Sequence, residues 1–525
     1  MNYDFWQAEL VFAKEHANYG RNEAFLELTT RIASTHLNDI FILLQVSNLQ
    51  LQFGFPSYAK KTLIHALAAS KNNRSALMTL AYAELQLGNF DLCAEIHQQL
   101  ICNFPNDLEV LSQYIYFSEY FPEHSDAMLL DIAKRWGDIA IQASAHNGKR
   151  PNFRTLDNQS LRVGYVSGDF CQHTVGILFK EILSHHNFKK FSIFCYNSGL
   201  VKDSITDDIS ALSHFMDVSS LSDLDFANRI KQDQIDILID LSGHTGGSRL
   251  SVFGYRPTPV MVSMLGYYAS TGLPYMDAFL LDSWHTFEST QKQFIEPIFQ
   301  LPMGRWCYRP AFSPSVAKFS PSFKNNYITF GSFNNTLKYN SAVFILWAKL
   351  LHAVPYSKLL LKWRTFNDPL YRQFVIDQFY SLGIEISRLD LRGPSFHEQM
   401  LEEYSEIDIA LDPFPFSGGV TSCEALYMGV PVITMPNTRV VSRQTYAFLS
   451  LINHHELVAH SEVEYIEIAK ALANDSLRLN HYRENLRMDM LNSPLMDIKA
   501  YTKSLEDALY QIYQDIRAQP NRKIT

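Results

Sequence analysis

Short apolar runs alternate with helical stretches over a large part of the chain that follows residue 160. The first series of runs ends in small or polar residues and comprises Leu161–Phe170, Phe191–Gly199, Ile235–Gly247 and Val260–Tyr267. A helical stretch such as Gly176–His186 lies between two of them. Strands that alternate with helices form a parallel sheet, and ligands of such sheets lie beyond the carboxyl ends of the strands. We therefore expect Ser167–His173 and Ser242–Gly247 to lie at a cleft.

A second series of strands follows a stretch rich in Pro and Ser at about residues 309–326. Its runs are Tyr327–Asn335, Lys358–Trp363, Arg388–Gly393, Ile407–Asp412 and Val430–Pro436. The chain is thus predicted to hold two Rossmann-like halves, at residues 151–315 and 316–525, the second ending in helices. Two such halves that face a cleft make up the GT-B architecture, which is the α/β fold class that we expect.

The first 150 residues are predicted to form an all-α domain built from repeats. Gly20, Gly54 and Gly88 are spaced 34 residues apart, which is the period of tetratricopeptide repeats. The third unit, Ala76–Asp107, has small and apolar residues, a turn glycine and a terminal proline at the positions that this repeat favours. An ordinary helical bundle is the alternative. Stacked helix pairs form concave surfaces, so we expect this region to bind a protein or peptide.

Composition limits the classes of protein to which the chain can belong. The 525 residues are 47% hydrophobic and 19% charged, which suits a globular chain of about three domains. The net charge of −9 argues against nucleic acid as a partner. The six cysteines are scattered and form no CxxC pair, so neither a disulfide framework nor a metal cluster is indicated. No secretory leader and no long apolar run are found, so we expect a cytoplasmic protein without a membrane span.

The segment SGGVTSCE lies between two apolar runs and forms the loop of a predicted βαβ unit. Its glycines can take positive φ, its Thr and Ser can cap the helix, and its glutamate is expected to lie in the first helical turn. A helix N-terminus of this kind can hold a phosphate. The glutamate would either accept hydrogen bonds from ribose hydroxyls or merely favour the helix dipole. The candidate nucleotide-binding residues are Gly418, Gly419, Thr421, Ser422 and Glu424.

Five blocks resemble, in order, the catalytic region of the O-GlcNAc transferase and SPINDLY family, glycosyltransferase family 41. They are LRVGYVSGDFCQH, IDLSGHTGGSRLSVFGYRPTPVMVSMLGY, STGLPYMDAFLLD, ITFGSFNNTLK and the stretch Asp412–Met435, and the resemblance covers about residues 160–515. The short repeat region ahead of it resembles the bacterial members. The resemblance implies an inverting, metal-independent transferase that needs no cofactor. It would move GlcNAc or glucose from a UDP-sugar to Ser or Thr of a protein held by the repeats and the cleft.

The resemblance also implies roles for single residues. Lys338 matches a lysine that contacts the donor diphosphate, and His173 matches an active-site histidine described as a general base or as a phosphate or acceptor contact. His244 lies in a loop that matches the acceptor side. Their structural alternatives are a solvated lysine at a helix start, a structural histidine and a turn histidine. Further donor-binding residues implied by the match are Asn335, Pro394 and His397, with the five residues of the glycine-rich loop.

Several positions depart from the family pattern and leave the function partly open. Gly419-Val420-Thr421 lacks one side-chain donor that relatives have near the phosphates, Met400 replaces a frequent histidine, and Tyr267-Tyr268-Ala269 replaces Tyr-Pro-Gly. The alternatives are an asparagine N-glucosyltransferase, an O-fucosyltransferase that uses GDP-fucose, and a non-catalytic repeat scaffold. The acidic pair Asp223 and Asp225 follows a serine and is interpreted as part of a helix cap, not as a metal site.

Overall fold

A computed structural model describes residues 3–145, 148–155 and 160–519 of the chain. These residues form two compact units, and each unit combines separate stretches of sequence. The first unit comprises Met1–Val110, Val316–Phe414 and Glu462–Arg483, and the second comprises Leu111–Ser315, Pro415–Ser461 and Glu484–Thr525. The three domain ranges expected from the sequence stay a prediction.

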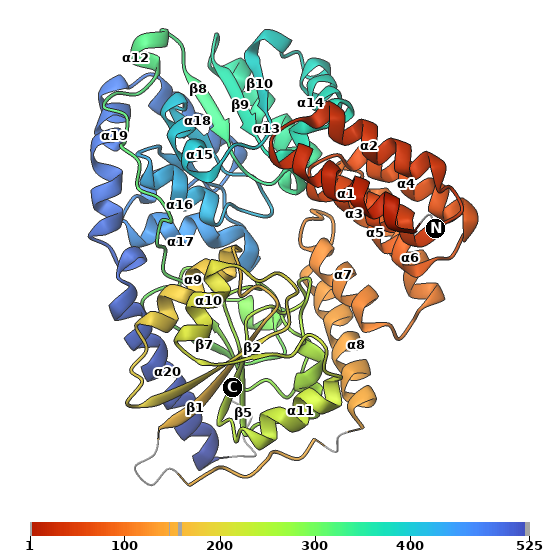
Figure 1. The fold of residues 1–525 in the computed structure, drawn as a ribbon. Coiled ribbons are helices and arrows are strands. Elements are labelled where there is room, and N and C mark those ends of the chain that lie inside the picture. The colour runs from red at the N-terminus through yellow and green to blue at the C-terminus, as the bar shows by residue number, and fades with distance from the viewer. Residues whose placement is uncertain (1–2, 146–147, 156–159, 520–525) are drawn as a thin grey trace. The chain divides into compact units, whose positions relative to one another are not determined.

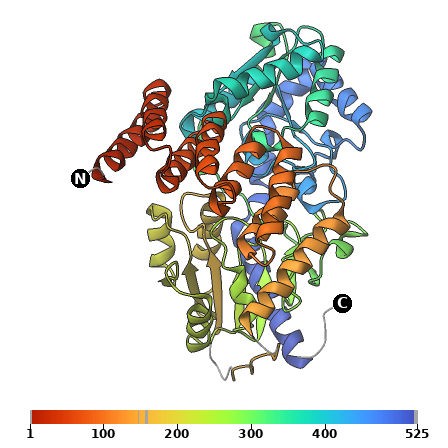
Figure 2. The same ribbon diagram turned by 90° about the vertical axis from the view of Figure 1, so that its right-hand side faces the viewer.

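Six helices at the start of the first unit form consecutive pairs, as expected for the repeat-like region. They are α1 (Tyr3–Asn18), α2 (Asn22–Thr35), α3 (Ile40–Gln52), α4 (Pro56–Ala69), α5 (Arg74–Gln86) and α6 (Phe90–Asn103). Figure 1 shows them in red and orange, and Figure 2 shows the same helices after a quarter turn. Gly20, Gly54 and Gly88 each occupy the turn inside one pair, with φ of 70°, 84° and 79°. The predicted all-helical, repeat-like region is confirmed, and the 34-residue spacing corresponds to a recurring left-handed turn.

A buried polar chain joins neighbouring repeat helices. The Gln50 amide of α3 donates to the Thr29 hydroxyl of α2 at 3.3 Å, and its carbonyl accepts from the Thr62 hydroxyl of α4 at 2.9 Å. All three side chains are buried. Because a buried polar group without a partner is costly, these bonds specify one register of the three helices within an otherwise apolar core.

The first unit also contains a parallel sheet with the strand order β10-β9-β8-β11. The strands are β8 (Thr329–Ser332), β9 (Lys358–Lys362), β10 (Leu389–Arg392) and β11 (Ile409–Leu411). The helices around them are α12 (Ser322–Asn325), α13 (Ser341–Ala353), α14 (Pro369–Ser381), α15 (His397–Glu403) and α18 (Glu462–Ala473). Each of these strands lies inside an apolar run predicted to form one.

The repeat helices pack directly on this part of the unit. Asp368 is fully buried and its carboxylate accepts from the backbone N–H of Ser57 at 2.8 Å and from the Ser57 hydroxyl at 2.7 Å. Helix α4 contacts α14, and α5 contacts the short turn Thr336–Lys338 that follows β8. Residues more than 300 positions apart are therefore held together by a buried carboxylate.

The second unit contains a seven-stranded parallel sheet with the order β3-β2-β1-β4-β5-β6-β7. Its strands are β1 (Leu161–Ser167), β2 (Phe191–Asn197), β3 (His214–Asp217), β4 (Ile237–Asp240), β5 (Val260–Ser263), β6 (Ala278–Leu281) and β7 (Ile298–Gln300). Four of them were predicted. The pattern missed β3, β6 and β7, which have three or four residues each.

Helices complete the second unit, some of which are labelled in Figure 1. Near the sheet are α9 (Thr174–Ser184), α10 (Ser204–Ala211), α11 (Asp223–Gln232) and the long C-terminal helix α20 (Ile498–Ala518), which packs against α9 and β5. The other elements are α7 (Leu108–Ser118), α8 (Asp126–Ser144), α16 (Val420–Tyr427), β12 (Val432–Ile433) and α17 (Gln444–Leu451), and α19 (Ser476–Leu491) has residues in both units. Ser222 caps α11 by accepting from the Asp225 N–H, so the acidic pair there has the predicted helix-cap setting.

We expect Gly54→Ala to destabilise the protein much more than Gly20→Ala, although the two glycines occupy equivalent turns of two helix pairs and both have positive φ. A Cβ at Gly54 would lie 2.1 Å from the Arg364 carbonyl oxygen, whereas a Cβ at Gly20 meets nothing within 4 Å. Gly20→Ala should cost only the left-handed strain of about 1–2 kcal/mol, and Gly54→Ala about 1–3 kcal/mol more from overpacking. Urea unfolding of the two variants measures the difference, and equal losses would contradict the close packing at Gly54.

Candidate functional site

The predicted site residues form two groups, one in each unit. The first unit contains Asn335, Lys338, Pro394 and His397. The second unit contains His173, His244 and the glycine-rich loop with Gly418, Gly419, Thr421, Ser422 and Glu424. Within each unit these residues lie just beyond strands of the parallel sheet or at the start of a helix.

Lys338 lies in a short turn, Thr336–Lys338, that follows the carboxyl end of β8. The Asn335 side chain caps this turn by accepting from the Leu337 N–H at 3.2 Å. The Lys338 ammonium donates to the Asn334 side-chain oxygen at 3.2 Å. These contacts give Asn335 a structural role beside any contact with a donor, and they orient the lysine through its neighbour Asn334.

Burial changes the electrostatics of this lysine. Removal from water lowers the pKa of Lys338 to about 8, and the nearby Asp412 carboxylate opposes that shift. Asp412 is buried and directly follows β11, the strand that pairs with β8. Lys338 is therefore charged at neutral pH, but its charge is much easier to remove than that of an ordinary lysine. Such a cation gains more than an exposed one when an anion approaches it, because little water screens the pair.

Pro394 and His397 follow the carboxyl end of β10, two strands away from β8. Pro394 is exposed, and the half-buried His397 is the first residue of α15. The backbone carbonyl of Gly393 accepts from the Lys362 ammonium at 2.9 Å, and Lys362 also pairs with Glu403 of α15 at 2.8 Å. This ion pair ties the end of β9 to α15 and so holds the segment that carries both predicted donor-binding residues.

The glycine-rich loop differs from the prediction in three ways. Gly419 is the N-cap residue of α16 and provides no side-chain cap, so Thr421 and Ser422 do not cap the helix. Neither Gly418 nor Gly419 has a positive φ. Glu424 is the fifth residue of α16 and lies in its second turn, not the first. The cap and the position of Glu424 differ because the helix begins at Val420, earlier than the Thr and Ser pair suggested.

A neighbouring helix holds this loop by hydrogen bonds that the sequence did not indicate. The Ser422 and Thr445 hydroxyls lie 2.8 Å apart, and the Thr445 hydroxyl also donates to the Gly418 carbonyl at 3.2 Å. The Gln444 N–H donates to the Ser417 hydroxyl at 3.1 Å. Gln444 and Thr445 begin α17, more than 20 residues away, and no local motif marks them. Thr421 is half-buried and Glu424 is buried, so the ordered loop presents mainly its backbone and Thr421.

His173 is the N-cap residue of α9, in the loop that follows β1. Its Nδ1 accepts from the Val175 N–H at 3.3 Å and lies 3.6 Å from the Asp169 carboxylate. In the neutral ring the proton is therefore on Nε2. The side chain is half exposed, so this nitrogen can exchange a proton with a ligand or with water.

His244 lies in the loop after β4, which pairs with β1, so the two predicted histidine loops are neighbours. The ring is buried, and its Nε2–H donates to the Thr271 carbonyl at 3.0 Å while Nδ1 accepts from the Ser112 hydroxyl at 3.1 Å. Trp136 packs edge-on against it, with ring centroids 4.8 Å apart. Burial lowers the pKa of His244 to about 3, so it stays neutral. A direct catalytic role for His244 stays a prediction, because both nitrogens have protein partners.

The residues that hold His244 were not predicted. Ser112 belongs to α7 and Trp136 to α8, in the range that the sequence pattern assigned to the repeats. The buried Glu296 holds the segment whose Thr271 carbonyl accepts from the His244 ring. Its carboxylate accepts from the Thr271 N–H at 2.6 Å and from the Ser270 hydroxyl at 2.6 Å. These partners are more than 20 residues from the histidine, and only the tertiary structure brings them together.

In the described part of the chain, no group of three or more His, Cys, Asp or Glu side chains is arranged to hold a metal ion. The cysteines are all free, and most are buried. Among the described helices, none has the length and apolar character that crossing a membrane requires.

Comparison with known proteins identifies related sequences and structures. The model of the family "Glycosyl transferase family 41" matches residues 114–305 and 317–505. A probable UDP-N-acetylglucosamine–peptide N-acetylglucosaminyltransferase, SPINDLY, from Hordeum vulgare is 35% identical over 397 residues, which are 74% of this chain and 42% of that protein. The corresponding SPINDLY from Oryza sativa is 34% identical over 403 residues, 75% of this chain and 43% of its own length. The chain thus spans about two fifths of the length of these curated relatives.

One solved structure is similar over almost the whole chain. It is a point mutant of the O-GlcNAc transferase of Thermobaculum terrenum, with a TM-score of 0.87 and 27% identity. The match covers 99% of this chain and 100% of the other. The predicted combination of a helical repeat region with GT-B halves is therefore confirmed as the fold class.

We expect His244 to make stability depend on pH below neutrality. Its folded-state pKa of about 3 lies below the usual value, so below pH 6.5 the unfolded chain binds a proton that the folded chain does not. The contribution of His244 is thus complete above pH 6.5 and is lost as the pH falls toward 3. Urea unfolding of wild type and His244→Asn at pH 7.5 and pH 5 should show their difference shrink by about 2 kcal/mol.

The matched control is His185→Asn, which changes an exposed histidine of the same unit. A pH effect that both variants share would not be due to the buried ring of His244. A His244→Asn difference that is independent of pH would show that the ring is not held neutral.

Proposed function

Because the chain belongs to glycosyl transferase family 41, we propose that it transfers one sugar from a UDP-sugar to Ser or Thr of a protein, with inversion and without a metal ion or cofactor. Family membership confirms the predicted class, a glycosyltransferase. The relatives are named as probable UDP-N-acetylglucosamine–peptide N-acetylglucosaminyltransferases, which favours GlcNAc as the sugar and a protein as the acceptor. A cytoplasmic location and an acceptor-binding role for the repeat helices are further parts of this proposal.

The observation that carries the proposal is the setting of Lys338. In an inverting transfer the acceptor hydroxyl oxygen attacks the anomeric carbon, the bond from that carbon to the diphosphate oxygen breaks, and the hydroxyl proton is released. The products are the glycosylated protein, UDP and a proton. The leaving diphosphate gains negative charge as the bond breaks, and a half-buried ammonium oriented by Asn334 can stabilise that charge. Stabilising charge that develops only in the transition state accelerates the reaction.

The glycine-rich loop supports a second contact with a phosphate. Gly419 caps α16 and has no side chain, so no cap side chain lies between the start of the helix and a ligand. A phosphate at this position would gain from the helix dipole. Hydrogen bonds from Thr445 and Gln444 hold the loop in place, which lowers the entropy lost when a donor binds.

The decisive test is product analysis with defined donors. Purified protein is incubated with UDP-GlcNAc, UDP-glucose or GDP-fucose and a cell extract as the source of acceptors, and modified peptides are located by mass spectrometry. We expect a mass increase of one N-acetylhexosamine on Ser or Thr. Lys338→Met should lower the rate at least about 100-fold, whereas Lys349→Met, which changes an exposed lysine on α13, should leave it unchanged.

Other outcomes of this test would identify the alternatives. A hexose on asparagine would indicate an N-glucosyltransferase, and a deoxyhexose from GDP-fucose an O-fucosyltransferase. Absence of transfer and of donor hydrolysis with all three nucleotides would contradict the proposal and favour a binding scaffold.

We expect UDP affinity to fall as the pH rises through about 8. The free protein loses the Lys338 proton there, since its pKa is lowered to about 8. Bound diphosphate favours the charged lysine, so binding above that pH must take up a proton, and affinity should fall by up to tenfold per pH unit. Isothermal titration from pH 6.5 to 9.5, in buffers of different ionisation enthalpy, measures both effects. An affinity that is constant over this range, or equally pH-dependent in Lys338→Met, would exclude the lysine as the diphosphate contact.

A further inference from the structure

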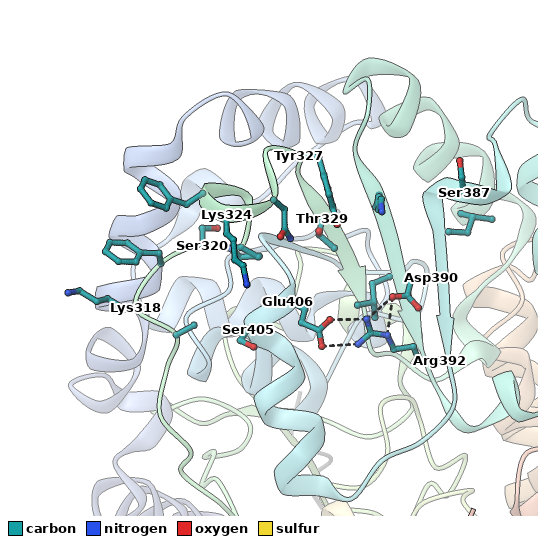
Figure 3. Close-up of a pocket in the computed structure, with 18 residues that line it drawn as sticks. Lys318, Ser320, Lys324, Tyr327, Thr329, Ser387, Asp390, Arg392, Ser405 and Glu406 are labelled. Atoms are coloured by element: carbon teal, nitrogen blue, oxygen red, sulfur yellow. Dashed lines mark hydrogen bonds and ion pairs between the residues drawn. The ribbon is translucent and has the colours of Figure 1, made fainter.

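A groove of about 770 Å³ lies along the sheet of the first unit. Figure 3 shows its lining, which comes from the segment around Lys318–Asn325, from β8, β9 and β10, and from Ser405 and Glu406. Thr329, Lys358 and Leu389 are the first residues of the three strands. Its volume lies in the range of about 300–1,000 Å³ that is typical of ligand sites.

This groove is distinct from the candidate donor site. None of the predicted site residues of this unit, Asn335, Lys338, Pro394 and His397, lines the groove, although along β10 the groove reaches the last residue of the strand, Arg392. Along β8, the groove residue Thr329 is separated from the turn of Lys338 by the length of the strand, about 10 Å. A ligand in the groove would therefore not occupy the donor position.

Some charged side chains of the groove form ion pairs with described residues, and others do not. Arg392 forms ion pairs with Asp390 at 2.6 Å and with Glu406 at 2.8 Å, and these dashed contacts are drawn in Figure 3. Its guanidinium also holds both oxygens of Glu406, so both lining carboxylates are paired with this one arginine, while the lining has four cations in all. Among the described residues, no ion pair involves the other three cations, Lys318, Lys324 and Lys358. The lining thus has surplus positive charge in a chain whose net charge is −9.

Aromatic side chains lie beside these lysines. The rings of Phe319 and Phe323 stack with centroids 5.3 Å apart, yet their side chains are 45% and 69% exposed. The Lys358 ammonium lies over the Tyr327 ring at 4.5 Å. Exposed aromatic residues next to cations are typical of binding surfaces, because a partner can cover the rings and gain hydrophobic energy there.

We propose that this groove binds an acidic segment of a partner protein in an extended conformation, with an apolar side chain placed on the Phe319 and Phe323 pair. Two observations favour a carboxylate-rich chain over a single phosphate group. The ammonium groups of Lys318 and Lys324 point in different directions in Figure 3, so they do not converge on one anion. Arg392, the residue suited to bidentate phosphate binding, already holds two carboxylates.

Fluorescence anisotropy with two labelled peptides tests this inference. One has twelve residues, rich in Glu and Asp, with two leucines at its centre, and the other has Lys in place of each acidic residue. The acidic peptide should bind and the basic one should not. Raising the salt concentration from 50 to 300 mM should weaken binding severalfold, since the attraction is electrostatic and exposed. The double variant Lys324→Ala/Lys358→Ala should weaken it at least tenfold and remove most of the salt dependence.

Matched variants distinguish the groove from general surface effects. Lys349→Ala/Lys470→Ala removes two exposed charges elsewhere in the same unit and should change the affinity less than twofold. Phe323→Ala should weaken binding severalfold without changing its salt dependence, whereas Tyr380→Ala, which truncates a 68% exposed ring on α14, should not. A melting midpoint equal to that of wild type confirms that each variant is folded.

Three results would overturn the proposal. They are no binding of the acidic peptide at 1 mM, binding that is insensitive to the groove variants, and equally tight groove-dependent binding of inorganic diphosphate, which would indicate a small-anion site. The proposal does not depend on sugar transfer. Titration with UDP reports on the donor site alone, so a chain that binds no UDP but binds the peptide would refute the proposed function and leave this inference standing.

Discussion

The buried carboxylate of Asp368 is the interaction on which the organisation of the first unit depends. It accepts two hydrogen bonds from Ser57 of the repeat helix α4 and two from the N–H groups of Leu370 and Tyr371, which begin α14. A fully buried carboxylate is tolerated only when its hydrogen-bonding capacity is used in this way. The same contact region includes the close approach of Gly54 to Arg364 and the packing of α5 on the turn that carries Lys338. The repeat helices are thus a structural support for the candidate site.

Burial lowers the pKa of both Lys338 and His244, but it leaves the two residues in different charge states at neutral pH. For Lys338 it lowers the pKa only to about 8, because Asp412 opposes the shift, and the residue stays charged at neutral pH. For His244 it lowers the pKa to about 3, because the ring has only neutral partners. The lysine is therefore suited to electrostatic catalysis. The histidine is suited to holding together α7, α8 and the loops that follow β4 and β5, and its neutral ring does so without an unpaired buried charge.

Much of the fold and part of the site could be predicted from the sequence. Nine strands lie in predicted runs, and the 34-residue glycine spacing corresponds to three turns with positive φ. The catalytic blocks predicted a family that the comparisons confirm. The prediction was wrong where it depended on the local chemistry of a short segment. Thr421 and Ser422 are frequent cap residues, but the helix begins earlier, and the Ser422 hydroxyl bonds to Thr445 instead.

The sequence by itself determined the elements and their order, because hydrophobic period, glycine spacing and motif order are local properties of a chain. Tertiary structure alone decided the environment of each functional group, because burial and hydrogen-bond partners come from distant segments. Ser112 and Thr271 fix the tautomer of His244, and Asp412 tunes Lys338. The basic groove also depends on tertiary structure, because its lysines lie along one groove only when three strands and the segment before β8 are side by side. Electrostatic energies depend on distance and on the exclusion of water, and neither quantity is written in a linear sequence.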